Sequence, residues 1–571
     1  MKYTHHNNEL TIEHIGQSVF LKGWVQKSRN LGGLIFIDLR DRFGITQLLV
    51  KPENNYYEIA TKIRNEYVIE VKGTVIERES KNKTIKTGEI EVEVTELTVL
   101  SQAETPPIIV SNDTDALEDT RLKYRYLDLR RPVMQNFLIK RHWITQAIRE
   151  VLVNEGFYEL ETPILGKSTP EGARDYLVPS RLYAGHFYAL PQSPQIYKQL
   201  FMVAGFEKYF QIARCFRDED LRADRQPEFT QVDIEASFVD QVDVQALIER
   251  ILVHTFKKIL GVDVKAPFLR MSYHDALSFY GTDKPDLRYD LKIKDYTPYF
   301  KSIQVPIFQG KTMVRGLVVK ASESFTRKRL DQFGELVKKN HGDALAYIKH
   351  TDGQYSGSIV KFFSDEQLKS LSIEDGHILF LVPGEFENVS DALGALRIEL
   401  ANELNLIEKN RYEFLWVVDW PLLEYNEDEK RFYAKHHPFT APVNPEDLKT
   451  NPKQAMAKAY DIVLNGYEIG GGSIRIHRQD VQQLMFDTLG LTKEDIEHRF
   501  GFFVDALKYG TPPHGGLALG LDRIVMLMTD TTNIKDVVAF PKTQSAKDMM
   551  MSAPSDVEEI QLDELHIKVS E

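Results

Sequence analysis

The chain has 571 residues, 42% of them apolar, and a formal net charge of −13. A chain of this length forms several domains, and its apolar content allows a buried core in each. The acidic balance argues against a protein that coats nucleic acid non-specifically, so any nucleic-acid contact is expected to be local and salt-sensitive.

Cysteine usage and hydropathy restrict the setting. Cys215 is the single cysteine, which excludes an intramolecular disulfide and a cysteine-based zinc site. The sequence contains neither a basic-then-apolar N-terminal segment nor an apolar run of about 18 residues. We therefore expect a reducing, cytoplasmic setting and no membrane partner.

Residues 1–103 contain five segments of alternating apolar residues, with one helical segment, 56–65, after the third. This order predicts an OB-fold β-barrel, whose open face binds oligonucleotides by stacking and hydrogen bonding. Phe36 is expected to point away from the core, because its strand neighbours alternate with it. It can stack on an unpaired RNA base or pack under a loop, and the sequence favours neither.

A linker and a long helix follow the barrel segment. Residues 104–119 contain two successive prolines and little periodicity, which is typical of an inter-domain linker. Residues 132–155 have the apolar stripe of an amphipathic helix, and the segment GFYELETPIL then predicts a strand that stops at Pro163.

Two polar segments come next. Residues 168–176 are rich in turn formers and are a candidate mobile lid. Residues 192–200, QSPQIYKQL, predict a loop that turns into a helix with Gln195 and Lys198 on one face. The alternative for Lys198 is an ordinary solvated helix lysine.

An antiparallel hairpin is predicted from strands at 209–216 and 229–238, joined by a loop rich in arginine and carboxylates. Guanidinium groups bind phosphate oxygens and carboxylates bind Mg²⁺, so this loop suits a nucleotide triphosphate with its metal. A charged turn whose ions neutralise one another is the alternative.

Residues 288–410 alternate between strand and helix patterns and contain no polar cluster at motif spacing, which predicts a separate α+β insertion. Residues 455–465 form a helix or a strand that carries Asp461. The segment GYEIGGGSIRIH then predicts two strands, with Glu468 and Arg475, joined by glycines that let the backbone approach a ligand.

The segment GGLALGLDRIVML, residues 515–527, predicts a glycine-spaced strand that runs into an apolar helix with Arg523 in its first turn. A guanidinium beside helix N-terminal amides forms an anion site. A small-residue strand packed against a helix is the alternative.

Together these segments resemble the class II aminoacyl-tRNA synthetases. The strand ending at Pro163, the FRDE loop with Arg217 and GLALGLDR with Arg523 are similar to the three signature motifs of that family. The intervening TPEGARDY, LPQSPQIYKQL, RQPEFTQ, HHPFT, EIGGGSIRIH and KYGTPPHGG resemble bacterial-type aspartyl-tRNA synthetases, and the likeness covers essentially the whole chain.

The resemblance implies a multidomain α+β fold and a homodimer with an interface near Pro163. Its catalytic domain would hold six or so antiparallel strands flanked by helices, with no Rossmann sheet. The implied domains are the OB-fold anticodon-binding domain at 1–103, a linker at 104–119, the catalytic domain at 120–287 and 411–571, and the α+β insertion at 288–410.

The implied reaction activates L-aspartate with ATP to aspartyl-adenylate and pyrophosphate, then transfers aspartate to the 3′ terminal adenosine of tRNA(Asp). The substrate carboxylate is the nucleophile, so catalysis comes from positioning and from neutralising phosphate charge. Alternatives are a non-discriminating enzyme that also charges tRNA(Asn), and a catalytically silent RNA-binding paralogue. Leu31 favours strict specificity for tRNA(Asp).

The resemblance also implies roles for individual residues. Arg217 would bridge the substrate carboxylate and the α-phosphate, Arg523 would bind the γ-phosphate, and Glu219 completes the catalytic set. The predicted ATP-binding residues are Arg217, Asp218, Glu219, Gln226, Phe229, Glu468, Gly520, Leu521, Asp522 and Arg523. The predicted Mg²⁺ ligands are Glu219, Asp461 and Glu468. The predicted tRNA-binding residues are Arg29, Phe36, Gln47, Arg78, Glu91, Arg222 and Arg225.

The predicted aspartate pocket is cationic. A bidentate Arg475 with Lys198 would hold the substrate side chain and exclude asparagine, whose amide would set N–H groups against a guanidinium. A lysine-charging relative would need carboxylates at these positions. His436 and His437 are expected to carry charge near neutral pH and to respond to the bound carboxylate. The predicted aspartate-binding residues are Glu171, Ser193, Gln195, Lys198, Arg217, Asp233, His436, His437 and Arg475.

Overall fold

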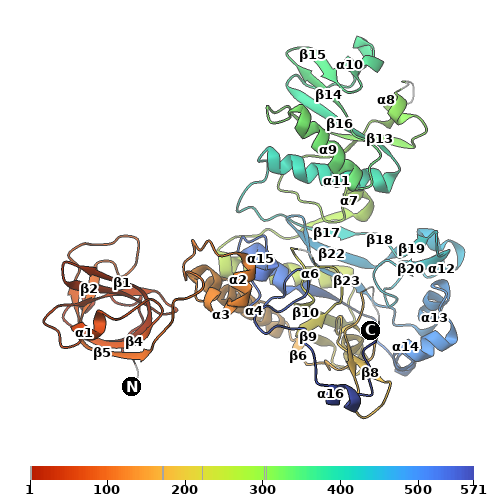
Figure 1. Cartoon of the computed structure of the whole chain (residues 1–571). Helices are drawn as coiled ribbons and strands as arrows, with labels where there is room; N and C mark the ends of the chain where they lie inside the picture. The colour runs from red at the N-terminus through yellow and green to blue at the C-terminus, as the bar shows by residue number, and fades with distance from the viewer. Residues whose placement is uncertain (1–2, 170–172, 222, 301–302, 304, 571) are drawn as a thin grey trace. The chain divides into compact units, whose positions relative to one another are not determined.

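The computed structural model describes residues 3–169, 173–221, 223–300, 303 and 305–570 (Figure 1). The chain divides into two compact units. The first comprises Met1–His142, Leu221–Gln226 and Thr531–Val557, and the second comprises Trp143–Asp220, Pro227–Asp530 and Glu558–Glu571.

The first unit contains a closed five-stranded barrel in the order β1-β2-β3-β5-β4 (Figure 1). Every second residue of β2 points inward, so Ile35, Ile37 and Leu39 are buried and Phe36 is not, as predicted. The helix expected at 56–65 is a single turn. The elements are β1 (Ser18–Leu31), β2 (Leu34–Arg40), β3 (Ile45–Val50), α1 (Tyr57–Ala60), β4 (Val68–Glu77) and β5 (Ile90–Ser101).

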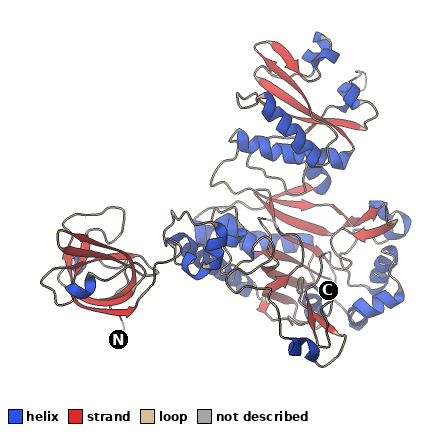
Figure 2. Ribbon diagram, viewed as in Figure 1, coloured by secondary structure: helices blue, strands red, loops and turns tan. Residues whose placement is uncertain are grey.

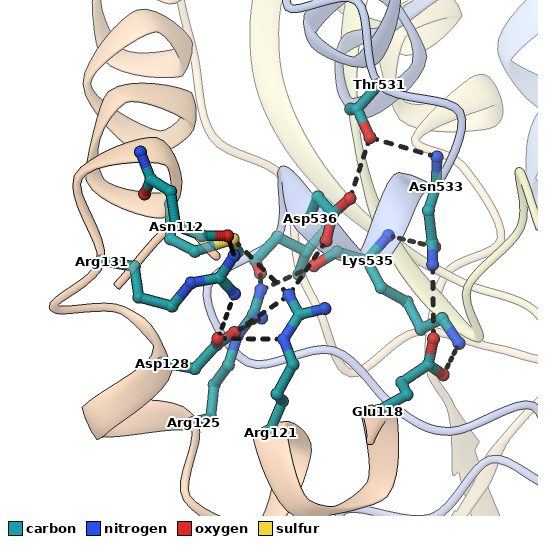
Figure 3. A network of polar contacts seen from close by, with 12 residues as sticks. Asn112, Glu118, Arg121, Arg125, Asp128, Arg131, Thr531, Asn533, Lys535 and Asp536 are labelled. Atoms are coloured by element: carbon teal, nitrogen blue, oxygen red, sulfur yellow. Dashed lines mark hydrogen bonds and ion pairs between the residues drawn. The ribbon is translucent and has the colours of Figure 1, made fainter. Parts of the chain in front are cut away.

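Short helices α2 (Glu118–Lys123) and α3 (Arg125–Asp128) precede α4 (Pro132–Asn154), which has nearly the length predicted. Three arginines converge on the fully buried Asp128 (Figure 3). Asp128 Oδ1 accepts Arg121 Nε at 3.0 Å and Arg131 Nη1 at 2.6 Å, while Oδ2 accepts Arg125 Nη1 at 2.7 Å. We call these four residues the hinge network.

The hinge network also fixes the C-terminal segment of the first unit. Arg125 donates to the backbone carbonyls of Lys535, Val538 and Ala539 at 2.7 to 2.9 Å. Lys535 in turn pairs with Glu118 at the start of α2 (Figure 3). Residues far apart in sequence are therefore held together by ionic groups and backbone oxygens.

The second unit is built on an eight-stranded sheet in the order β11-β17-β22-β23-β24-β10-β9-β6 (Figure 2). The six central strands pair antiparallel, as predicted, whereas the outermost pairs, β11 with β17 and β6 with β9, are parallel. The strands are β6 (Tyr158–Glu159), β9 (Lys208–Phe216), β10 (Glu228–Ser237), β11 (Leu269–Ser272), β17 (Phe414–Val418), β22 (Ala459–Leu464), β23 (Tyr467–Ile474) and β24 (His514–Gly520).

The glycine-rich segment differs from its prediction, because β23 is one continuous strand and not two strands joined by glycines. A Cβ atom on Gly472 would lie 2.1 Å from the carbonyl oxygen of Gly516, and one on Gly470 would lie 2.7 Å from that of Ala518. The glycines therefore allow β24 to approach β23 closely. The helices beside the sheet include α5 (Gln195–Val203), α6 (Gln241–Leu260) and α15 (Leu521–Met528).

The predicted α+β insertion forms its own five-stranded sheet, in the order β12-β13-β16-β14-β15. Helices α9 (Arg327–Lys339) and α11 (Phe386–Glu403) share an apolar core with it. Its strands are β12 (Lys294–Asp295), β13 (Met313–Lys320), β14 (Ala346–Thr351), β15 (Gln354–Gly357) and β16 (His377–Gly384). Across the described ranges, no helix combines the length and apolarity needed to span a membrane.

Candidate active site

A network of buried charges joins α5, β10 and the end of β23. Lys198 Nζ donates to Asp233 Oδ1 at 3.0 Å and lies 3.7 Å from Glu235 Oε2. Arg475 donates Nε and Nη2 to the two carboxylate oxygens of Glu235 at 2.9 and 3.1 Å. Each of these four side chains is at most 2% exposed. We call them, with His437, the pocket network.

The strand register explains how β10 buries two carboxylates. Asp233 and Glu235 are two residues apart and so share one face of the sheet. Gly516 lies opposite Glu235 on β24, and a Cβ there would lie 2.2 Å from Glu235 Oε2. The glycine provides the space for the carboxylate. Sequence reasoning missed Glu235, although its alternation with apolar residues in a central strand was a usable signal.

The two carboxylates have opposite electrostatic environments. Burial raises the pKa of Asp233 despite the charge of Lys198. For Glu235, burial is outweighed by the charges of Arg475 and Lys198, which lower its pKa. Asp233 Oδ2 is buried and has no hydrogen-bond partner in the described structure. Asp233 therefore presents an open acceptor in a pocket whose other carboxylate is fully engaged.

Arg475 is held differently from its prediction. The guanidinium fork expected to grip the substrate side chain is occupied by Glu235. Nη1 donates to Ser473 Oγ and to His437 Nε2, both at 2.8 Å. Because a guanidinium has five N–H donors, these four bonds leave one for a ligand among the described contacts. A substrate carboxylate would meet this remaining N–H and the Lys198 ammonium.

The adjacent histidines point apart, and both are neutral at pH 7, which corrects the predicted charge. An arginine can only donate, so His437 Nε2 accepts from Arg475, while His437 Nδ1 lies 3.2 Å from the backbone nitrogen of Phe439. Burial and Arg475 hold the pKa of His437 well below its ordinary value. Burial, with Lys435 beside it, lowers the pKa of His436 to about 4. His436 Nε2 lies 3.9 Å from Asp461 Oδ1.

Glutamines extend the pocket network along α5. Gln195 Nε2 donates to Gln199 Oε1 at 2.9 Å, and Gln199 Nε2 lies 3.2 Å from His514 Nε2. Gln199 and His514 are buried members that the sequence did not single out. Ser193 Oγ accepts the N–H of Gln195 at 3.3 Å, at the start of the helix. Glu171 lies outside the described residues.

The hairpin places Arg217 over Phe229. The guanidinium carbon lies 5.0 Å from the ring centroid, so one face of the ring predicted to stack on adenine already carries a cation. Arg217 Nε is buried without a hydrogen-bond partner in the described chain. Asp218 pairs with Arg174 through a backbone bridge and a 3.8 Å ion contact. A bound anion would give Arg217 Nε the hydrogen-bond acceptor that it lacks among the described residues.

Several predicted loop residues belong to the first unit. There the Gln226 side chain accepts the N–H of Lys542 at 2.8 Å and donates to its carbonyl at 3.2 Å. The roles predicted for Glu219 and Arg225 stay predictions, and Arg222 lies outside the described residues.

Two carboxylates meet beside β23. Asp461 on β22 faces Gly471, and a Cβ there would lie 2.7 Å from Asp461 Oδ1 and 3.6 Å from Glu468 Oε1. Burial and the charge of Glu468 raise the pKa of Asp461 well above its usual range. Asp461 Oδ1 is buried without a hydrogen bond to any described residue. The pair therefore fits a hard cation such as Mg²⁺, whose preferred ligands are oxygens.

A third predicted metal ligand is not assembled with this pair. In the described part of the chain, no group of three His, Cys, Asp or Glu side chains gathers as a metal site. The three-ligand set with Glu219 stays a prediction.

Helix α15 begins as predicted, with Gly520 at its N-cap and Arg523 in its first turn. Arg523 Nη1 donates to the carbonyl oxygen of Glu468. Asp522 is buried and its Oδ2 accepts the N–H of Thr230 at 2.8 Å, which ties the helix to β10. Leu521 is buried too.

The predicted RNA-binding residues of the barrel also come together. Arg29 Nη2 donates to Asp38 Oδ1 at 2.7 Å and to Gln47 Oε1 at 3.4 Å, and Gln47 Nε2 donates to Glu91 Oε2 at 2.6 Å. Phe36 lies opposite Arg29 in the strand register. Burial raises the pKa of Glu91, against opposing effects from Gln47 and Arg78.

Comparison with known proteins places these features in context. The family described as tRNA synthetases class II (D, K and N) matches residues 117–544, and the OB-fold nucleic acid binding domain family matches residues 19–100. The aspartate–tRNA(Asp/Asn) ligase of Geobacillus sp. (strain WCH70) is 52% identical, covering 99% of this chain and 98% of its own. The protein of the same name from Anoxybacillus flavithermus (strain DSM 21510 / WK1) is 53% identical, covering 100% and 98%.

Solved structures share the fold. The asparaginyl-tRNA synthetase from Pyrococcus horikoshii complexed with asparaginyl-adenylate superposes with a TM-score of 0.61 at 21% identity, covering 95% of this chain and 99% of its own. The aspartyl tRNA synthetase from Entamoeba histolytica gives 0.58 at 20% identity, covering 95% and 91%. At these identities the likeness concerns the fold alone.

Proposed function

The chain belongs to the class II tRNA synthetases of the D, K and N family, and from that membership we propose the chemistry of its pocket. It is an aspartate–tRNA ligase that consumes ATP. The observation that carries the choice of amino acid is the buried meeting of Lys198 and Arg475 beside Asp233. The side-chain carboxylate of aspartate meets the cations, and its α-ammonium group meets the open oxygen of Asp233.

This arrangement discriminates against neighbouring amino acids. Lysine would place a third cation beside the buried Lys198 and Arg475. The amide N–H groups of asparagine would face the N–H groups of these two side chains and leave them without an acceptor. A site built to bind a charged group rejects an analogue that leaves its buried groups unpaired, by factors of about 10⁴ in comparable polar pockets.

The first chemical step needs no protein nucleophile. An oxygen of the aspartate α-carboxylate attacks the α-phosphorus of ATP, a P–O bond forms, and the bond to pyrophosphate breaks. Arg217 binds the oxygens on which negative charge develops, and Arg523 holds the terminal phosphate at the start of α15. In the second step the ribose hydroxyl of the tRNA terminal adenosine attacks the aspartyl carbonyl carbon, and AMP leaves.

Asp461 and Glu468 would hold Mg²⁺ with the nucleotide. When bound, the ion neutralises phosphate charge and orients the triphosphate. The protein supplies the buried Asp461 and the half-buried Glu468 for it, and His436 borders Asp461 as a neutral ring.

On tRNA choice, we propose that the chain charges both tRNA(Asp) and tRNA(Asn), as the names of its full-length relatives state for them. This proposal departs from the expectation based on Leu31, which is 60% exposed at the end of β1. The barrel residues Arg29, Phe36, Gln47, Arg78 and Glu91 would contact the anticodon.

Aspartate-dependent pyrophosphate exchange tests the activity, and aminoacylation of both tRNAs side by side tests the specificity. We expect exchange with aspartate and none with lysine or asparagine, and comparable charging of both tRNAs. Exchange with lysine alone would overturn the assignment, while charging of tRNA(Asp) alone would overturn only the tRNA choice.

A homodimer is the proposed assembly. Tyr158, Ile164 and Leu165 follow α4 and are 64%, 42% and 52% exposed, an apolar set that a second copy would cover. Analytical ultracentrifugation should give a mass near twice that of the chain. A Tyr158→Glu variant should shift the equilibrium toward monomer.

A further inference from the structure

The first unit contains a cavity of about 380 Å³ that none of the predicted roles uses. Its wall is formed by the N-terminal segment, β1, the turn after β2, the end of β5 and the turn between α3 and α4. None of the predicted anticodon-binding residues, Arg29, Phe36, Gln47, Arg78 and Glu91, lies in this wall.

The wall is cationic. Lys22, Arg40, Arg42 and Arg130 line the cavity, against Asp41 as its only carboxylate in the described wall. The Asp41 charge is used locally, because its oxygens accept the backbone N–H groups of Asn7, Phe43 and Gly44 at 2.8 to 3.1 Å. An anion is therefore the expected ligand.

One guanidinium in this wall is incompletely bonded. Arg40 is 5% exposed, and its Nη2 donates to both oxygens of Glu66 at 3.1 and 2.9 Å. Glu66 also accepts Arg130 Nη1 at 2.8 Å, so one carboxylate serves two arginines. Arg40 Nη1 is buried and has no hydrogen-bond partner within the described structure. A buried donor without a partner is destabilising, and an acceptor oxygen placed on it would remove that cost.

Aromatic rings form the other part of the wall. Tyr3, His6 and Phe43 follow one another with ring centroids 4.8 and 3.8 Å apart, and the guanidinium of Arg42 lies 4.5 Å from the Phe43 centroid. Across the cavity, Arg130 lies 5.5 Å from the ring of Trp24. The ring planes of this column are tilted by 52° and 34°, and Tyr3 and Phe43 at its ends are 47% and 40% exposed, so each end offers a ring on which a nucleobase can stack.

We propose that this cavity binds one unpaired nucleotide, with its base stacked on the Tyr3, His6 and Phe43 column and its phosphate on Arg40 and Arg42. The nucleotide can come from single-stranded RNA or be a free ribonucleoside 5′-monophosphate. This site goes beyond the proposed aminoacylation and needs neither ATP nor aspartate.

Photocrosslinking tests the proposal on the full chain. The probes are 4-thiouridine 5′-monophosphate and a seven-nucleotide single-stranded RNA with one central 4-thiouridine, and mass spectrometry locates the crosslinked peptide. We expect a crosslink in residues 3–43. The double variant Arg42→Glu, Phe43→Ala should weaken this crosslink at least tenfold at equal probe concentration.

Two controls separate this site from others. Arg64→Ala alters an exposed arginine of the same barrel outside the wall and should leave the crosslink unchanged. Phe36→Ala should remove only RNA crosslinks at the anticodon face. A crosslink with the monophosphate identifies a free-nucleotide site, and one with RNA alone identifies an RNA site. The proposal fails if neither probe labels residues 3–43, or if the double variant labels as wild type.

Discussion

The hinge network and the pocket network each gather cationic side chains around a fully buried aspartate, but only one of them is complete. Asp128 accepts three arginines, and Arg125 and Arg131 donate further to backbone carbonyls while Arg121 also contacts Asp536. No atom of these four residues is an unpartnered buried atom in the described structure. In the pocket network, Asp233 keeps an oxygen without a partner.

The pKa directions follow this difference. Burial acts to raise both carboxyl pKa values, yet the bonds and charges of the arginines lower that of Asp128, whereas Lys198 does not prevent the rise for Asp233. An ionic network in which every buried polar atom has a partner stabilises the fold. A network that keeps a buried atom without a partner can bind a charged ligand there.

The largest effect is expected when Arg475 of the pocket network is replaced. Arg475→Lys retains the charge but cannot span both oxygens of Glu235, so we expect kcat/KM for aspartate in pyrophosphate exchange to fall on the order of 10³-fold or more. Arg478→Lys changes an exposed arginine three residues on and should change it less than twofold. A loss below tenfold for Arg475→Lys would mean that the pocket network is merely structural.

The matching change in the hinge network should affect stability instead. Asp128→Asn leaves three arginines, two of them buried, short of one negative charge, and we expect the free energy of unfolding in urea to fall by about 3–5 kcal/mol. KM for aspartate should stay within about twofold at 25 °C. Asp115→Asn, at an exposed position, is the control for both measurements. A large rise in KM with unchanged stability would contradict the comparison.

His436, which lies beside the pocket network, should make the free energy of unfolding depend on pH. The pKa of His436 is about 4 in the folded chain and ordinarily 6.5, so between these values only the unfolded chain binds the proton. Stability should therefore be lost as pH falls from about 6.5 to about 4, by up to about 3 kcal/mol. His436→Asn should flatten this part of the stability profile, and His498→Asn, on the surface, should not. An unchanged slope in His436→Asn would show that the ring is protonated while folded.

The smallest effect is expected at the carboxylate pair. Because the pKa of Asp461 is raised, its ionisation costs stability as pH rises through the folded value, and Asp461→Asn should gain about 1 kcal/mol at pH 9 without metal. Addition of Mg²⁺ should raise the melting temperature of wild type more than that of the variant. Equal Mg²⁺ shifts would argue against a cation at this pair.

The sequence predicted the helices and strands whose apolar residues recur with a regular period, and the side chains that belong to the family's sequence motifs. The hairpin strands, α4 and the helix with Arg523 lie where they were expected, and Lys198 and Arg475 both contact Glu235. Glu235 was missed although it alternates with apolar residues, and the space for its carboxylate is shown by the register that sets Gly516 opposite. Asp461 was predicted, but the glycine that faces it, Gly471, is likewise identified only by the strand register.

Charge states were the least predictable feature. The sequence shows two adjacent histidines, whose ordinary pKa lies near neutrality. Their burial, and the arginine that donates to one of them, come from segments distant in the chain. The occupied fork of Arg475 has the same origin, since its acceptor lies 240 residues earlier.

Glu235 has a consequence for the thermodynamics of ligand capture. Two long, flexible cationic side chains would otherwise lose rotamer entropy each time a substrate arrived, at about 0.5–1.5 kcal/mol apiece. A resident carboxylate immobilises both during folding, so the incoming amino acid meets a preformed receptor. The favourable free energy of its contacts is then offset very little by the cost of ordering the protein.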